Sequence, residues 1–178
     1  AHSMGVTVES ELGHVGSGSK YDTDGSSMYT DPAMAKDFVE RTGIDCLAVA
    51  VGTAHGVYTS TPKLDFDRIK AIKKEVGNLP LVVHGSSGVP YADLAKAGTM
   101  GINKVNMGFD FMDNIAKSLQ KRDFSGANSY NVWQYIQEAY MEKALEMIEY
   151  LGSKDKSWKV EGSYCTAASK LLGEGGEG

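Results

Sequence analysis

Two apolar runs that end in the same dipeptide, His-Gly, constrain the fold of this 178-residue chain more than any other feature. The first run is DCLAVAVGTAHGVY at residues 45–58, and the second is PLVVHGSSGVP at residues 80–90. Continuous runs rich in Val and Leu are typical of strands buried on both faces, which occur in parallel sheets covered by helices. We therefore expect one strand in each run, with His55 and His84 at the two strand ends.

The segment between these runs, residues 64–77, has apolar residues at near-helical spacing and a terminating glycine, Gly77. Strand, helix and strand in this order form a βαβ unit, so both strands end at the same edge of the sheet, where α/β proteins carry their chemistry. His55 and His84 can converge there on one metal ion. The alternative is that each histidine only hydrogen-bonds a loop. The repeated placement favours the metal, because each following glycine lets a ligand approach the backbone.

Composition excludes several classes of function. Hydrophobic residues make up 42% of the chain and charged residues 23%, which is enough to bury a core. The net charge of −5 and the lack of a basic run argue against a nucleic-acid partner. No apolar run reaches membrane-spanning length, so we expect no membrane partner. Cys46 and Cys165 form no metal or redox motif; Cys46 is expected to be a core thiol, as in a reducing cytoplasm, and we expect a cytoplasmic protein.

The remaining elements extend the same alternation. A strand is expected first, then a helix with Asp31 as its cap and Pro32 at its first position, and later a helix, a strand and a helix. These elements are expected at residues 6–13, 32–42, 90–98, 101–107 and 109–121. The Gly-, Ser- and Asp-rich residues 13–27 are expected to form a mobile loop over the site. Four strands, each followed by a helix, make half of an eight-fold barrel and leave two open sheet edges. We therefore predict an α/β fold, the C-terminal half of a (β/α)8 TIM barrel, with the first half lying outside this sequence.

The C-terminal part has a different character. Residues 131–152 form a predicted amphipathic helix whose aromatic and Met side chains indicate packing or a subunit contact. We expect a homo-oligomer, either a dimer or a tetramer. The predicted organisation is a barrel half at 1–122, a helical segment at 123–152 and a weakly structured tail at 153–178.

Five motifs resemble, in order, the class II zinc-dependent ketose-bisphosphate aldolases, whose best-known members act on fructose bisphosphate and tagatose bisphosphate. The motifs are VESELGHVG, YTDPAMAKDFVERTGIDCLAVAVGTAHGVY, PKLDFDRIKAI, LPLVVHGSSGVP and INKVNMGFD. The resemblance covers residues 1 to about 122. The family fold is a (β/α)8 barrel, in agreement with the pattern of strands and helices.

The resemblance implies that His55 and His84 are zinc ligands and that Glu11 occupies an alternative or second metal position. The family's third zinc histidine and its catalytic Asp lie in an Asp-x-x-His motif that this sequence does not contain. The implied cofactor is Zn²⁺, and a second, monovalent cation is left open. Since two family residues of the site are missing, we expect these 178 residues alone to be inactive.

The implied activity is aldol cleavage or condensation of a phosphorylated ketose such as fructose-1,6-bisphosphate or tagatose-1,6-bisphosphate, with dihydroxyacetone phosphate and an aldehyde as products. Zinc would polarise the carbonyl group and stabilise the enediolate. Asn106 matches the family's catalytic Asn that hydrogen-bonds the enediolate, with a helix cap as the alternative. The expected substrate- and phosphate-binding residues are Gly56, Gly85, Ser86, Ser87, Asn106, Met107, Gly108 and Phe109.

Two departures from the family pattern leave other functions open. Phe109 stands where many members have a threonine whose hydroxyl contacts phosphate. Ser19 stands near the position of an acidic loop residue that the family uses in proton transfer, with Asp22 or Asp24 as a substitute or as a solvated loop charge. The second hypothesis is therefore a degenerate, non-catalytic subunit of the same fold that binds a phosphosugar or serves in assembly. A third is isomerisation of a phosphosugar on the same barrel.

Overall fold

The computed structural model describes residues 1–14, 16–17, 29–56 and 58–157. Six strands, five α-helices and two short 3-10 helices lie within these residues. The strands are β1 (Glu9–Leu12), β2 (Gly16–Ser17), β3 (Cys46–Val49), β4 (Ala54–His55), β5 (Leu81–Val83) and β6 (Ile102–Val105). The helices are η1 (His2–Met4), α1 (Pro32–Thr42), α2 (Phe66–Val76), α3 (Tyr91–Thr99), α4 (Phe109–Gln120), η3 (Gly126–Asn131) and α5 (Val132–Tyr150).

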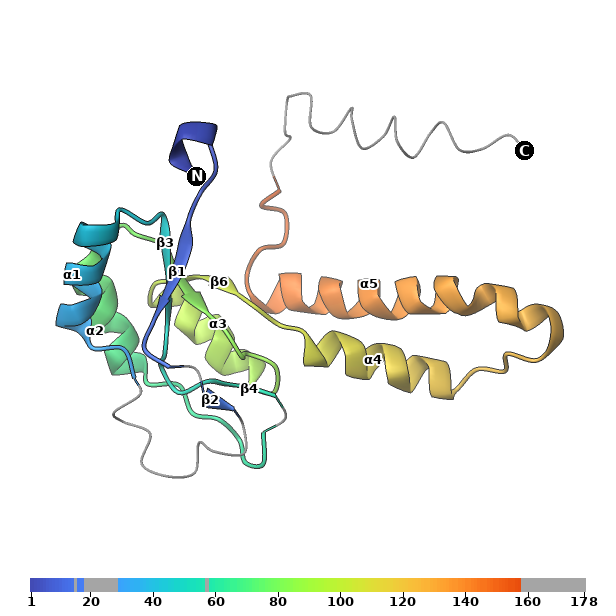
Figure 1. Cartoon of the computed structure of the whole chain (residues 1–178). Helices are drawn as coiled ribbons and strands as arrows, with labels where there is room; N and C mark the ends of the chain where they lie inside the picture. The colour runs from blue at the N-terminus through green and yellow to red at the C-terminus, as the bar shows by residue number, and fades with distance from the viewer. Residues whose placement is uncertain (15, 18–28, 57, 158–178) are drawn as a thin grey trace.

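The main sheet is parallel throughout and follows the order β1-β3-β5-β6 (Figure 1). If the two-residue strands β2 and β4 are left out, strands that are adjacent in the sheet are also consecutive along the chain. Those two pair with each other in a separate small sheet. A parallel sheet in chain order with a helix after each strand is the pattern of consecutive βα units in a barrel.

Local signals set the ends of the helices. The Asp31 carboxylate accepts hydrogen bonds from the N–H groups of Ala33 and Met34, at 2.9 and 3.0 Å, and caps α1. Gly43, with φ of 64°, ends the same helix in the left-handed conformation. Asp65 caps α2 through Arg68 N–H at 2.9 Å. The observed boundaries therefore lie close to those that the sequence predicts.

The core lies between one face of the sheet and the helices α1, α2 and α3. Leu47 on β3 and Leu81 on β5 are fully buried there, together with Ile69 and Ile72 from α2 and Leu94 from α3. Each such side chain stabilises the fold by about 1.5–3 kcal/mol relative to an exposed one. This packing fixes the sheet on which the site stands.

The opposite face of the sheet carries polar side chains. Glu9 and Glu11 on β1 are in register with Cys46 and Ala48 on β3, and registered neighbours point to the same face. The expectation that Cys46 is a core thiol is wrong: it is only half-buried and its Sγ donates to Glu9 Oε2 at 3.5 Å. Side chains along β3 alternate between the two faces of the sheet. Leu47 and Val49 point into the core, and Cys46 points to the other face.

The helices α4 and α5 form an antiparallel pair that projects away from the sheet (Figure 1). Asn114 on α4 donates to the carbonyl oxygen of Ala139 on α5 at 2.7 Å. The end of α5 returns to α3, where the rings of Tyr91 and Tyr150 lie 5.1 Å apart. The helix predicted at 131–152 is thus present, and the division of the chain at 122 and 152 stays a prediction.

The first apolar run does not form a single strand up to His55. Strand β3 ends at Val49, and His55 lies in β4, beside β2. The chain turns between them at Gly52, where φ is 108° and a Cβ would lie 2.2 Å from the carbonyl oxygen of Lys63. Only glycine fits such a turn, and this turn separates the strand from the histidine.

Two predictions fall wholly or mostly outside the described residues: the loop at 13–27 and the tail at 153–178. Within the part of the chain that is described, no helix combines the length and the apolar character that crossing a bilayer requires.

Candidate metal centre and substrate pocket

The three side chains predicted to be metal ligands lie together at one edge of the sheet. His84 directly follows β5, His55 ends β4, and Glu11 lies on β1. Each offers one ligand atom, and these atoms all lie within 4.8 Å of one another. The ring centroids of the two histidines are 6.2 Å apart, with an angle of 64° between the ring planes. The tertiary structure therefore brings together residues that are up to 73 positions apart, from 11 to 84.

The chemistry of these donors suits zinc. The Nδ1 atom of His84 lies 3.2 Å from Glu11 Oε2. Two ligands of a tetrahedral zinc with bonds of about 2.0–2.1 Å lie about 3.3 Å apart, so this pair already has a suitable separation. Two imidazoles and one carboxylate are also a ligand set that catalytic zinc sites use. The three residues present thus fit the cofactor that the sequence implies.

A second carboxylate, Glu9, lies behind His84. Its Oε1 is 3.0 Å from His84 Nε2, and its Oε2 accepts a hydrogen bond of 2.7 Å from Lys104 Nζ on β6. The Lys104 hydrogen bond is the main cause that lowers the pKa of Glu9, and the same bond raises the pKa of Lys104. Burial, followed by the nearby Glu9, raises the pKa of Cys46. Glu9 is therefore held as a carboxylate among three donors.

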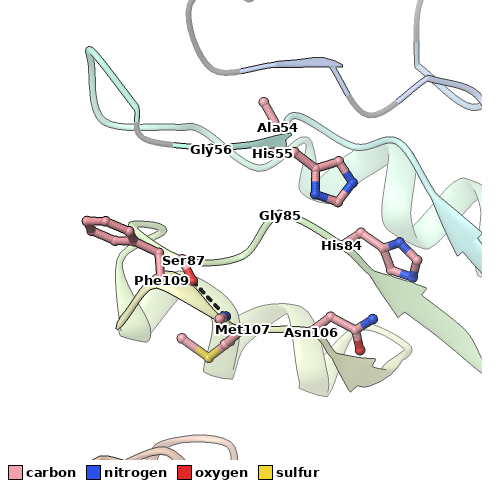
Figure 2. A pocket seen from close by; sticks show the side chains of 10 residues that line it. Ala54, His55, Gly56, His84, Gly85, Ser87, Asn106, Met107 and Phe109 are labelled. Carbon is pink, nitrogen blue, oxygen red and sulfur yellow. Dashed lines mark hydrogen bonds between the residues drawn. The ribbon is translucent and has the colours of Figure 1, made fainter. Parts of the chain in front are cut away.

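A pocket of about 330 Å³ opens beside the two histidines (Figure 2). It is lined by Ala54, His55, Gly56, His84, Gly85, Ser87, Asn106, Met107, Gly108 and Phe109. The segment after β6 supplies one wall and the two His-Gly segments supply the other. Figure 2 shows His84 and Asn106 near one end of the pocket and Phe109 at the other.

Seven of the eight residues expected to bind substrate and phosphate line this pocket, and Ser86 does not. Ser86 is fully buried; its hydroxyl donates to the Val83 carbonyl oxygen at 3.3 Å, and its N–H donates to the Asn106 carbonyl oxygen at 3.4 Å. Both of its donors are occupied within the protein. Ser87 differs, because its Oγ faces the pocket and accepts a hydrogen bond of 3.1 Å from Gly108 N–H.

Phe109 borders two cavities. Besides the first pocket it lines a second one of about 390 Å³, which is otherwise rich in hydroxyl groups. The second cavity is lined by Gly56, Tyr58, Thr59, Ser60, Thr61, Pro62, Ser87, Gly88 and Phe109. Phe109 is 49% exposed and lines both cavities, as Gly56 and Ser87 also do, and its apolar ring stands at the far end of the first pocket from His84.

Three residues that the sequence reasoning missed support the site: Glu9, Tyr58 and Lys104. Glu9 could have been found, since it lies two positions before Glu11 and so faces the same side of the strand. Lys104 could not, because a register shift between Leu81 and Val82 sets the face on which it lies.

Comparisons with known proteins show which family this chain resembles. The family model described as fructose-bisphosphate aldolase class-II matches residues 1–156, well beyond residue 122, near which the resemblance was expected to end. The protein YdjI of Escherichia coli (strain K12) is 40% identical over 157 residues, which are 88% of this chain and 55% of YdjI.

Solved structures show the same likeness. The crystal structure of the YdjI aldolase from Escherichia coli K12 has a TM-score of 0.74 at 37% identity and covers 88% of this chain and 53% of that chain. A putative fructose-1,6-bisphosphate aldolase from Coccidioides immitis gives a TM-score of 0.68 at 27% identity, covering 88% and 56%. A fructose-bisphosphate aldolase from Campylobacter jejuni gives 0.65 at 25% identity, covering 85% and 53%.

The chain spans about half the length of each of these relatives. Its parallel sheet, with a helix after each main strand, corresponds to part of a (β/α)8 barrel, which confirms the predicted fold class. The match over residues 1–156, together with these structures, shows that the chain belongs to the class II fructose-bisphosphate aldolase family.

Proposed function

We propose that this chain supplies the metal-binding and substrate-binding half of a metal-dependent aldolase. The reaction is aldol cleavage or condensation of a phosphorylated ketose of the fructose-1,6-bisphosphate or tagatose-1,6-bisphosphate type. One observation carries the proposal: the ligand atoms of Glu11, His55 and His84 lie within 4.8 Å of one another, and both histidines line the pocket that Asn106 also lines.

The residues that would hold Zn²⁺ are His55, His84 and Glu11. When bound, Zn²⁺ acts as a Lewis acid on a carbonyl oxygen. Asn106 follows β6 at the same rim, and its amide can donate a hydrogen bond to a substrate oxygen that gains negative charge as the carbon–carbon bond breaks. A second, monovalent cation stays a prediction.

The phosphate would lie deeper in the pocket. Gly56 and Gly85 carry no side chain into the pocket, and Ser87 also lines it, with its hydroxyl directed toward Gly108 N–H. Gly108 begins α4, so the positive end of that helix dipole also favours an anion. Phe109 offers no hydroxyl, and the phosphate would be held mainly by these neighbours.

Metal binding is the first test of the proposal. We expect the chain to bind one Zn²⁺ in isothermal titration calorimetry, and we expect His55→Ala and His84→Ala each to weaken binding strongly. His2→Ala is the matched control, because His2 pairs with Asp45 at the far end of the fold. Equal affinity in all four proteins would contradict the assignment.

Activity requires a protein that carries both halves of the barrel, because this sequence has no Asp-x-x-His motif. In such a protein, we expect cleavage of a ketose bisphosphate that stops on addition of a chelator and returns with Zn²⁺. We expect the 178 residues alone to give no cleavage. Cleavage that a chelator leaves unchanged would exclude the metal mechanism.

The degenerate, non-catalytic subunit is the second candidate, favoured by Phe109 in the pocket wall. It predicts that a ketose phosphate binds with no cleavage, even when both halves and Zn²⁺ are present. Exchange of a substrate C–H proton with solvent in that protein, without carbon–carbon cleavage, would instead indicate an isomerase.

A further inference from the structure

The carboxylate of Glu9 contacts three side chains from other parts of the sheet. Its Oε2 accepts from Lys104 Nζ at 2.7 Å and from Cys46 Sγ at 3.5 Å. Its Oε1 lies 3.0 Å from Nε2 of His84. The carboxylate therefore has a defined position behind the His84 ring, on the side away from Glu11.

The two nitrogens of His84 consequently face two different carboxylates. A carboxylate can only accept hydrogen bonds, and Nε2 makes the shorter contact with one, 3.0 Å to Glu9 against 3.2 Å from Nδ1 to Glu11, so we assign the proton of the neutral ring to Nε2. In the neutral ring Nδ1 then carries the lone pair, and it faces Glu11 Oε2 at 3.2 Å. Two atoms that bind the same zinc ion have about this separation. Nδ1, and not Nε2, is thus the atom of His84 that is available to a metal.

Glu9 itself is a poor candidate for a ligand. The ammonium group of Lys104 is bonded to its Oε2, and a divalent cation next to that group would meet a like charge. Glu9 also lies outside the group of three residues whose ligand atoms converge. Its contacts are those of a group that orients a ligand from behind.

We infer that Glu9 is a positioning residue: anchored by Lys104, it keeps the proton of His84 on Nε2 and presents Nδ1 to the metal. This inference rests on the proposed zinc site and adds to it the identity of the ligand atom and the residues that select it. Its consequence is that metal affinity depends on two side chains, Glu9 and Lys104, that do not touch the metal.

The ligand atom is tested directly on the full chain, uniformly labelled with ¹⁵N and ¹³C at histidine and loaded with Zn²⁺. The ring shifts of His84 should show Nδ1 bound to the metal and a proton on Nε2. This measurement needs no variant and so cannot be confused with misfolding. Coordination through Nε2 would overturn the inference while leaving the zinc site intact.

The positioning role is tested by the Zn²⁺ affinity of variants, measured by calorimetry. Removing such a partner typically lowers metal affinity by about 10–100-fold. We expect a loss in this range for Glu9→Ala, a smaller loss for Glu9→Gln, which keeps an acceptor for His84, and an intermediate loss for Lys104→Met. Glu75→Gln removes an acidic charge from the exposed side of α2 and should change nothing.

Thermal unfolding of the metal-free proteins separates positioning from folding. The inference holds if Glu9→Ala loses affinity while its metal-free melting temperature stays near that of the parent. It is overturned if Glu9→Ala binds Zn²⁺ as tightly as the parent, or if its affinity falls only in proportion to a loss of folded protein. No Zn²⁺ binding by the parent chain would overturn both this inference and the proposed function.

Discussion

The hydroxyl group of Tyr58 donates a hydrogen bond of 2.7 Å to the carbonyl oxygen of Gly85. The same hydroxyl accepts a hydrogen bond of 2.5 Å from the N–H of Ala54. One side chain thus bridges the two His-Gly segments immediately beside His55 and His84. The bridge ties together the two backbone segments that carry the candidate metal ligands.

Tyr58→Phe should lower the free energy of unfolding by about 1–3 kcal/mol, because it leaves the buried N–H of Ala54 and the carbonyl of Gly85 without this partner. Urea unfolding of the metal-free chain measures the loss. Tyr130→Phe is the control, since Tyr130 is 87% exposed on η3. Similar losses in both variants would contradict a bridging role for Tyr58.

Gly85→Ala should destabilise the chain by more than the Tyr58 substitution. Gly85 has φ of 65°, and a Cβ there would lie 2.3 Å from the carbonyl oxygen of Ala54. The left-handed conformation alone costs a non-glycine residue about 1–2 kcal/mol, and the contact with the backbone adds to it. Gly98→Ala, inside α3 with open space around it, should instead stabilise the chain by about 0.5–1 kcal/mol. If Gly85→Ala and Gly98→Ala change the free energy of unfolding in urea equally, the backbone has moved to make room for the Cβ at residue 85, and the prediction is wrong.

Asp45→Asn should flatten the decline of stability in acid. The N–H of Val8, at 2.6 Å, and then the His2 ring hold the pKa of Asp45 below its ordinary value of 3.8. The unfolded chain binds a proton more readily, so this stabilisation is present above that value and is lost as the pH falls through the lower pKa of the folded state. The free energy of unfolding, measured in urea at a series of pH values below about 4, should therefore fall more steeply in the parent. Parallel curves would refute the prediction.

Asn106→Ala should reduce aldol cleavage about 10²–10³-fold in a protein that carries both halves, if its amide donates to the oxygen that gains charge. Zn²⁺ affinity should stay unchanged, because Asn106 lies outside the converging ligand group. The comparison of turnover with calorimetry separates substrate chemistry from metal loss. An equal fall in metal affinity would mean that Asn106 acts on the metal site.

The outer side of α5 should mediate self-association. Trp133, Met141 and Leu145 are 72%, 59% and 59% exposed there. Patches of this kind commonly contact another subunit. Met141→Glu with Leu145→Glu should reduce the mass measured by light scattering from that of a dimer or tetramer to that of a monomer. Lys156→Glu, on the exposed turn after α5, is the control. A parent chain that is already monomeric would contradict the expected homo-oligomer.

Local chemistry explains why so much of the fold is predictable from the sequence. Asp31 and Gly43 bound α1 through a cap and a left-handed turn that depend on neighbouring residues only. The run at Leu81–Val83 is apolar on both faces, so it can only be a covered strand, and the histidine after it must lie at the edge of the sheet. His55 and His84 follow from the apolar runs that end in His-Gly, and Glu11 follows only from the resemblance to a family.

The partners of those ligands depend on contacts between distant strands. Lys104 reaches Glu9, 95 residues away, only because a register shift between Leu81 and Val82 pairs Val82 with Lys104 after Leu81 pairs with Ile102. Simple alternation from the buried Ile102 would have turned Lys104 toward the core, and no local signal in the sequence marks the shift. The sequence therefore determined the helix ends and the strand before His84, since local caps and apolar runs decide these, whereas the end of β3 at Val49 and the separate strand of His55 came from the structure. Only the tertiary structure decided that Glu9 and Lys104 stand behind His84, because strand register is set by packing across the whole sheet.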